Sequence, residues 1–280
     1  MAQRVGMDFV GPFAFNALRF LLGGLVLIPL ILLQRKQPAS TTWPQPLFTR
    51  KTVLSGAIAG SVLFGGASLQ QIGIISTTAG KAGFITELYV ILVPLLGLLW
   101  KKRTHLEAWL GAILAVWGLY LLSVTREFTI SYGDFLVLLS AFFWAFHVQI
   151  IDGFVAHSHA LVLACLQFFV CALLSALVFL FTETASWMAV YAAGLPILYA
   201  GLFSTGIAYT LQVVAQREAH PAHAAILLSL ESVFAVLGGW LLLSETLSER
   251  QFIGCALMLG GMMASQLNIF PGVRSSVSKN

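Results

Sequence analysis

The feature that most constrains this chain is a series of apolar runs, each about as long as a bilayer's hydrocarbon core is thick. A helix needs about 20 apolar residues to cross that core. The sequence predicts nine such spans, separated by short polar breaks. They cover residues 12–33, 53–75, 82–100, 106–123, 132–151, 160–182, 192–214, 223–243 and 250–267.

Composition excludes a soluble globular domain. The chain is 59% hydrophobic and only 9% charged, whereas a soluble domain carries about 25% charged residues. The net charge of +4 is spread over the loops, so we expect no nucleic-acid partner. The expected partners are the lipid bilayer and a small-molecule substrate, with a homo-oligomer left open. The three cysteines lie in apolar runs without metal-ligand spacing, and we expect neither a metal nor a cofactor.

Basic residues orient the predicted spans. If the spans alternate, ten Lys and Arg residues fall on one face and four on the other. Short loops rich in Lys and Arg stay in the cytoplasm. The bias therefore places the loops 34–52 and 101–105, and the C-terminus, on the cytoplasmic side of a bacterial inner (plasma) membrane.

Landmarks recur along the chain at a nearly constant offset. Leu69-Gln70 and Leu211-Gln212 are 142 residues apart, and Glu87 and Glu231 are 144 apart. The pattern GxxLxxxG occurs from Gly111 and again, 143 residues later, from Gly254. The offset covers five spans, an odd number, so matching spans cross in opposite directions. Inverted repeats of this kind build many secondary transporters. The same arithmetic leaves the fifth span without a mate and predicts that a helix before the first span is absent.

Four stretches carry a family resemblance through their order and spacing. They are "TTAGKAGFITELYVILVPLLGLL" (77–99), "WLGAILAVWGLYLLS" (109–123), "YGDFLVLLSAFFWAF" (132–146) and "SLESVFAVLGGWLLLSETLSERQFIGCALMLGG" (229–261). In this combination the chain resembles the EamA-type permeases of the drug/metabolite transporter superfamily. The resemblance implies ten helices in two inverted five-helix repeats, cytoplasmic termini and alternating access. This chain matches from the second helix onward.

These observations predict an all-α membrane protein of about nine transmembrane helices in two inverted repeats. The first repeat, incomplete, covers 1–123, the second covers 124–270, and 271–280 form a cytoplasmic tail. We expect a permease for a small organic metabolite or drug-like solute. Coupling of this transport to protons is one option that the sequence leaves open. One alternative is a non-transporting structural or sensing subunit, or a truncated inactive form. A membrane-embedded enzyme is disfavoured because HExxH, GxSxG and paired-Asp motifs are absent from the sequence.

Two carboxylates inside predicted spans are the main site candidates. Charges in mid-membrane are costly, roughly 2.5–3.5 kcal/mol on insertion scales. Glu87 and Glu231 are equivalent under the repeat, and each either binds a proton or cationic group or hydrogen-bonds a neighbouring helix. Lys81 lies six residues before Glu87, about 240° around the helix after one full turn. The two therefore do not pair, and Lys81 is predicted to lie at the external cavity mouth. There its side chain either snorkels to water or contacts an anionic substrate.

Further candidates lie on other spans. Arg19 is seven residues inside the first span, where it either faces the cavity or pairs with a carboxylate. His147 either relays protons or lies at the membrane interface, and the interface is favoured. The remaining candidates for substrate or proton binding are Tyr89, Trp144, Gln70 and Gln212. For the aromatic residues, simple packing is the alternative.

Overall fold

The computed structural model describes residues 2–35, 48–77, 79–102, 104–123, 131–234 and 248–266, and this part of the chain contains helices and no strand. The helices are α1 (Ala2–Gly6), α2 (Pro12–Arg35), α3 (Arg50–Ile75), α4 (Ala79–Glu87), α5 (Tyr89–Leu99), α6 (Leu106–Ser123), α7 (Tyr132–Val155), α8 (Ala160–Thr182), α9 (Trp187–Ala192), α10 (Gly194–Tyr199), a π-helical stretch η1 (Ala200–Tyr209), α11 (Thr210–Ala215), α12 (Pro221–Leu228) and α14 (Glu249–Gln266).

The all-α membrane fold class is confirmed. Within the described residues, six helical segments are long and apolar enough to cross a membrane: Pro12–Gln34, Arg50–Ile75, Ala82–Leu99, Tyr132–Val155, Ala160–Thr182 and Gly194–Ala215. Two shorter apolar helices cover Leu106–Leu121 and Pro221–Phe234. The predicted spans thus coincide with helical segments, although the second half of the eighth span, residues 235–243, lies outside the described part.

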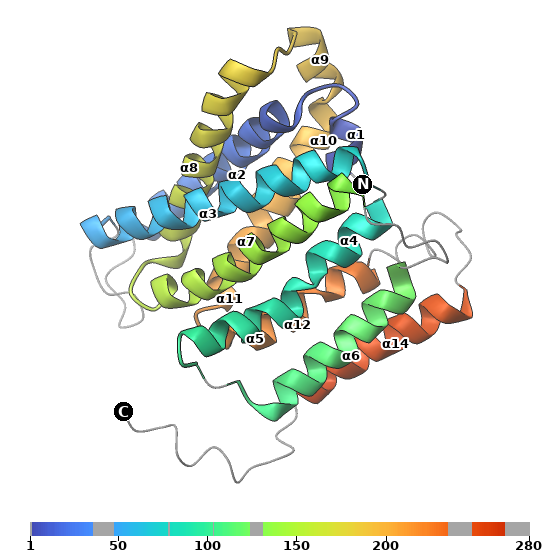
Figure 1. Ribbon diagram of the computed structural model, residues 1–280. Coiled ribbons are helices and arrows are strands. Elements are labelled where there is room, and N and C mark those ends of the chain that lie inside the picture. The colour runs from blue at the N-terminus through green and yellow to red at the C-terminus, as the bar shows by residue number, and fades with distance from the viewer. Residues whose placement is uncertain are drawn as a thin grey trace.

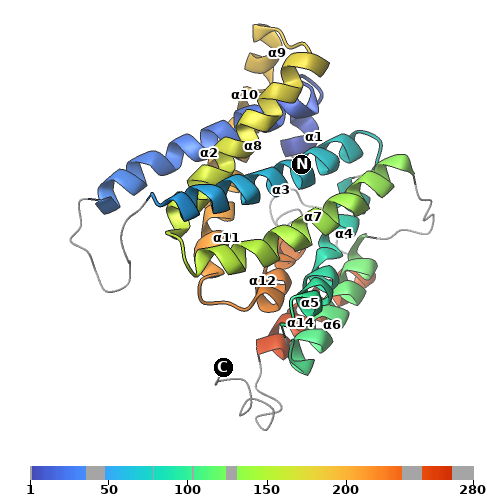
Figure 2. The same cartoon turned by 60° about the vertical axis from the view of Figure 1, so that its left-hand side comes forward.

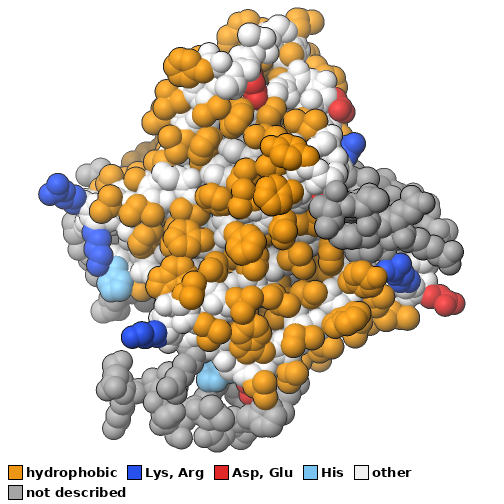
Figure 3. Space-filling view, in the orientation of Figure 1, with side chains coloured by type: hydrophobic (Ala, Val, Ile, Leu, Met, Phe, Trp, Pro, Cys, Tyr) orange, Lys and Arg blue, Asp and Glu red, His pale blue; other side chains and the backbone are white. Residues whose placement is uncertain are grey.

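The surface has the distribution expected of a membrane protein. Helices α3 and α7 lie side by side in two views, and α6 lies against α14 (Figure 1, Figure 2). Apolar side chains cover the middle of the visible face, while Lys, Arg, Asp and Glu lie towards its margins (Figure 3). Large exposed side chains such as Leu99, Phe181 and Trp187 belong to this apolar surface. Such a surface is stable against lipid tails and not against water.

Two glycine contacts join α6 and α14. A Cβ on Gly111 would lie 2.6 Å from the carbonyl oxygen of Gly261, and a Cβ on Gly118 would lie 2.6 Å from that of Gly254. The backbones therefore touch where the GxxLxxxG pattern occurs on both helices, as small residues in membrane helices allow. Adding 143 to Gly111 gives Gly254, and subtracting 143 from Gly261 gives Gly118, so the repeat offset turns the first contact into the second. An antiparallel two-fold relationship between matching helices requires this exchange.

A second pair of contacts behaves in nearly the same way. Gly60 of α3 approaches Val170 of α8, and Gly201 of η1 approaches Leu22 of α2. Adding the offset of 142 to Gly60 gives residue 202, one from Gly201, and subtracting 148, the separation of Arg19 and Gln167, from Val170 gives Leu22. Helix α7 packs against α3, α4 and α5, and the short helix α1, which precedes the first span, packs against α10. This packing supports the inverted repeats, and the boundaries at 123 and 270 stay predictions.

Candidate functional site

The span that contains Glu87 is broken at the carboxylate itself. Helix α4 ends at Glu87, Leu88 forms a turn, and α5 begins at Tyr89. The Glu87 side chain is 9% exposed. Ser232, 145 residues away, donates a hydrogen bond to Glu87 Oε1, while Oε2 has no partner among the described residues. Broken helices are frequent at transporter sites.

Glu231 lies next to this contact. Its neighbour Ser232 binds Glu87, and the two carboxyl groups are close enough to interact electrostatically. Their burial differs, since Glu87 is buried and Glu231 is exposed. The helices that carry Glu87 and Glu231, the two positions predicted to be equivalent, therefore meet at these residues. The hydrogen bond between the helices is made by the hydroxyl group of Ser232.

Three aromatic side chains extend from the carboxylates towards α2. Tyr89 lies within electrostatic range of Glu87, Glu231 and Tyr209. Trp144 of α7 packs edge-on against Tyr209, with ring centroids 5.7 Å apart. Tyr209 in turn lies 6.4 Å from the ring of Phe20. We call Glu87, Tyr89, Trp144, Tyr209 and Arg19 the central polar layer.

Arg19 occupies the other end of this layer. Its side chain is fully buried. Nε donates to Asn16 Oδ1 at 3.0 Å, and Cζ lies 4.6 Å from the Phe20 ring centroid. The two terminal nitrogens, Nη1 and Nη2, have no hydrogen-bond partner in the described part of the chain. The expected carboxylate partner is therefore not found among the described residues.

His147 is buried among helices, and its place at the membrane interface stays a prediction. Its side chain is 3% exposed. Nε2 is 2.8 Å from Gln167 Oε1 of α8, and its ring lies 6.2 Å from that of Trp144. Helix α7 is packed between α3 and α5 here, which carries a residue near the end of the span into the protein interior. His147 thus borders the central polar layer.

The remaining candidates lie apart from these groups. Gln70 Nε2 donates to Thr86 Oγ1 at 3.1 Å, one residue before Glu87. Gln212 is half-buried in α11, whereas Gln216, four residues later, is buried and donates to the carbonyl oxygen of Val148 at 2.9 Å. Lys81 lies in the first turn of α4, and its side chain is outside the described part.

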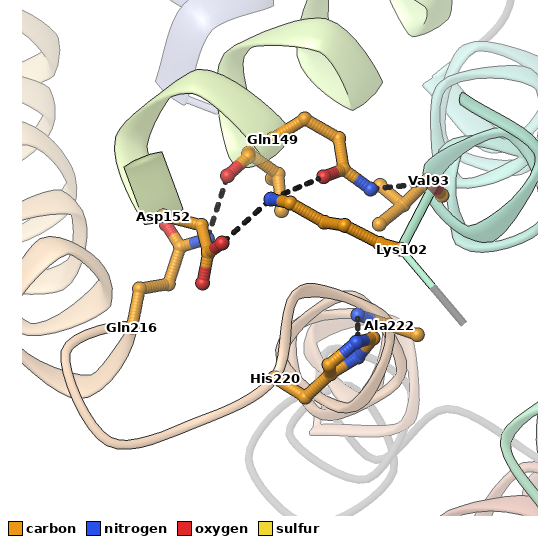
Figure 4. Close-up of polar contacts among 8 residues, drawn as sticks. Val93, Lys102, Gln149, Asp152, Gln216, His220 and Ala222 are labelled. Atoms are coloured by element: carbon orange, nitrogen blue, oxygen red, sulfur yellow. Dashed lines mark hydrogen bonds and ion pairs between the residues drawn. The ribbon is translucent and has the colours of Figure 1, made fainter. Parts of the chain in front are cut away.

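A polar cluster closes the end of the bundle at which α5 and α7 finish (Figure 4). Lys102 Nζ lies 2.6 Å from Asp152 Oδ2 and donates to Gln149 Oε1 at 3.0 Å. Gln149 Nε2 donates to the carbonyl oxygen of Val93 at 2.7 Å. His220 caps α12 by accepting from Ala222 N. Burial, and then the neighbouring His223, lower the pKa of His220.

Sequence reasoning missed Ser232, Asn16 and Gln216. Each is an uncharged polar residue in an apolar run, where such residues are common and weakly informative. Asn16 carries a usable signal, because it lies three residues before Arg19 on the same helical face. Within the described ranges, no three His, Cys, Asp or Glu side chains are grouped as metal ligands would be.

The sequence matches the model of the EamA-like transporter family twice, over residues 1–124 and 131–265. The chain belongs to the EamA-like transporter family. It is similar to an uncharacterized transporter of Archaeoglobus fulgidus, with 32% identity over 95% of this chain and 80% of the relative. The uncharacterized transporter YoaV of Bacillus subtilis is 24% identical over 99% of this chain and 94% of its own length.

A solved crystal structure shares the fold of this EamA chain. The two are 23% identical, with a TM-score of 0.75, over 94% of this chain and 91% of the other. Together with the six apolar helices, the family establishes a multi-pass membrane protein among relatives named as transporters.

Proposed function

We propose that this EamA chain is a secondary transporter that moves a small organic solute across a bacterial inner (plasma) membrane by alternating access. Its C-terminus then lies in the cytoplasm, as the basic-residue bias predicts. The observation that carries the proposal is Glu87, a buried carboxyl group at a helix break with one oxygen unpartnered among the described residues. A structural carboxyl group would satisfy both oxygens, because unpaired polar atoms are costly inside a membrane.

The carboxyl pair also suggests how transport is driven. Glu87 and Glu231 lie close enough to interact electrostatically. A protonatable pair of this kind either carries the driving proton or exchanges its proton for a cationic part of the substrate. The exposed position of Glu231 gives that proton a route to the surroundings.

Accessibility from both sides of the membrane tests the proposal without a known substrate. Ser232→Cys, in a chain whose three native cysteines are replaced, puts a thiol beside Glu87. Alternating access predicts labelling by an impermeant thiol reagent from either face of oriented vesicles. Ser61→Cys is the control, since Ser61 lies on the exposed face of α3 and should be shielded by lipid. Labelling of Ser232→Cys from neither face, or from one face only, would contradict the proposal.

A further inference from the structure

Arg19 is a permanently charged group that the described protein leaves incompletely paired. The guanidinium group is fully buried and stays protonated in proteins. It uses Nε to bind Asn16 and stacks near Phe20. Nη1 and Nη2 carry four N–H donors between them, and none has a partner in the described part of the chain.

Among the described residues, no acidic side chain is paired with this charge. The groups that interact with Arg19 electrostatically are Tyr209 and Cys171, whose side chains are neutral in their ordinary protonation states. A cation–π contact with Phe20 offsets part of the desolvation cost and supplies no hydrogen-bond acceptor. A buried cation normally has both an opposite charge and acceptors. The site therefore lacks an anion with at least two acceptor oxygens.

A further unpaired donor lies on the aromatic side of the same layer. Trp144 Nε1 is buried and has no partner among the described residues. Trp144 contacts Tyr209, and Tyr209 contacts Phe20, with centroid separations of 5.7 and 6.4 Å. The rings form an apolar wall that leads away from the guanidinium group.

We propose that Arg19 binds the carboxylate group of a small organic monocarboxylate, whose apolar or aromatic body lies against Phe20, Tyr209 and Trp144. The planar fork of Nη1 and Nη2 matches the two oxygens of a carboxylate. One guanidinium charge neutralises one carboxylate, whereas a phosphate dianion would keep one negative charge that is not neutralised. This inference rests on the proposed function, because Arg19 is closed to water here and a ligand reaches it only if the chain opens.

Binding to the purified full-length chain tests the assignment. The probes are benzoate and propionate at pH 7.5, with benzamide and propionamide as neutral counterparts of the same shape. The carboxylates should raise the thermal midpoint and the amides should not. Arg19→Gln should weaken carboxylate binding at least about tenfold, and Arg19→Lys, which keeps the charge without the fork, should bind with intermediate affinity. Carboxylates that stabilise no better than the amides would overturn the assignment.

Arg4→Gln is the matched control. Arg4 is also a cation near the N-terminus, but its Nη1 donates to the carbonyl oxygen of Thr77 at 2.7 Å. Losing it removes one positive charge and should leave carboxylate binding unchanged. Without ligand, Arg19→Gln should keep the thermal midpoint of the parent or raise it, because an unpaired buried charge is removed. A fall larger than that of Arg4→Gln would show that Arg19 is structural and would overturn the proposal.

The two proposals fail in different ways. If Arg19-dependent carboxylate binding is observed but Ser232→Cys is labelled from one face only, the anion site stands and transport is wrong. If Ser232→Cys is labelled from both faces but carboxylates bind no better than amides, transport stands and the anion site is wrong.

Discussion

Lys102 and Asp152 form an ion pair with Nζ and Oδ2 2.6 Å apart, and they join the chain after α5 to the last turns of α7. Gln149 accepts from the same Nζ and donates to the carbonyl oxygen of Val93. One cation thus fastens the broken span that carries Glu87 to the helix that carries Trp144.

We expect this ion pair to contribute modestly to stability. The two side chains are 29% and 25% exposed, so water screens their attraction. A double-mutant cycle with Lys102→Gln and Asp152→Asn should give a coupling energy of about 0.5–1 kcal/mol in chemical unfolding. High salt should reduce that value. A coupling energy of zero would contradict a stabilising role for this ion pair.

The backbone that delivers Lys102 is strained. Lys101 has φ 58°, in the left-handed region that disfavours side chains. Lys101 N donates to Leu98 O and Lys102 N donates to Gly97 O, the paired bonds of a Schellman cap in which glycine usually occupies the position of Lys101. We expect Lys101→Gly to stabilise the chain by about 1 kcal/mol. Lys101→Ala, which keeps Cβ, should give no such gain in the same unfolding assay.

The α6–α14 contact predicts a clear ranking of glycine substitutions. Gly118→Ala places a Cβ against the carbonyl oxygen of Gly254 and should cost about 1–3 kcal/mol, because two backbones must separate. Gly261→Ala meets Gly111 in the same way, at 2.7 Å. Gly260→Ala is the control, since nothing lies within 4 Å of its Cβ. Equal thermal midpoints for all three variants would contradict the close packing.

Stability should depend on pH through His220. Burial lowers the pKa of His220 in the folded chain below the ordinary 6.5. The unfolded chain therefore takes up the proton first, and the contribution of neutral His220 is lost as the pH falls below about 6.5. His220→Asn keeps an N-cap acceptor for Ala222 and cannot titrate. We expect this variant to lose less stability than the parent between pH 7 and pH 5. A parallel decline in both chains would exclude His220 as the source.

The sequence predicted the apolar helices and the family because both rest on long patterns. Glu87 and Arg19 were identifiable as candidates because a charge in an apolar run is rare. Their partners were not identifiable, since Ser232 lies 145 residues from Glu87 and a serine in a membrane helix gives no separate signal. The Lys102–Asp152 pair depends on Lys101, whose backbone adopts the left-handed conformation at a position where glycine is the common residue. Packing among distant helices, which no local pattern encodes, decided the burial of His147 and the difference between Glu87 and Glu231.

The most direct test of the account is solute uptake into proteoliposomes between about pH 5.5 and pH 8, with the parent chain, Glu87→Gln and Glu231→Gln compared. Glutamine keeps the shape and hydrogen-bonding capacity of the carboxyl group and removes its titration. The account predicts that both variants insert and fold as the parent does, and that at least one loses the pH dependence or the proton-driven component of uptake. Uptake by both variants that matches the parent across this pH range would contradict the account and make the two carboxyl groups structural.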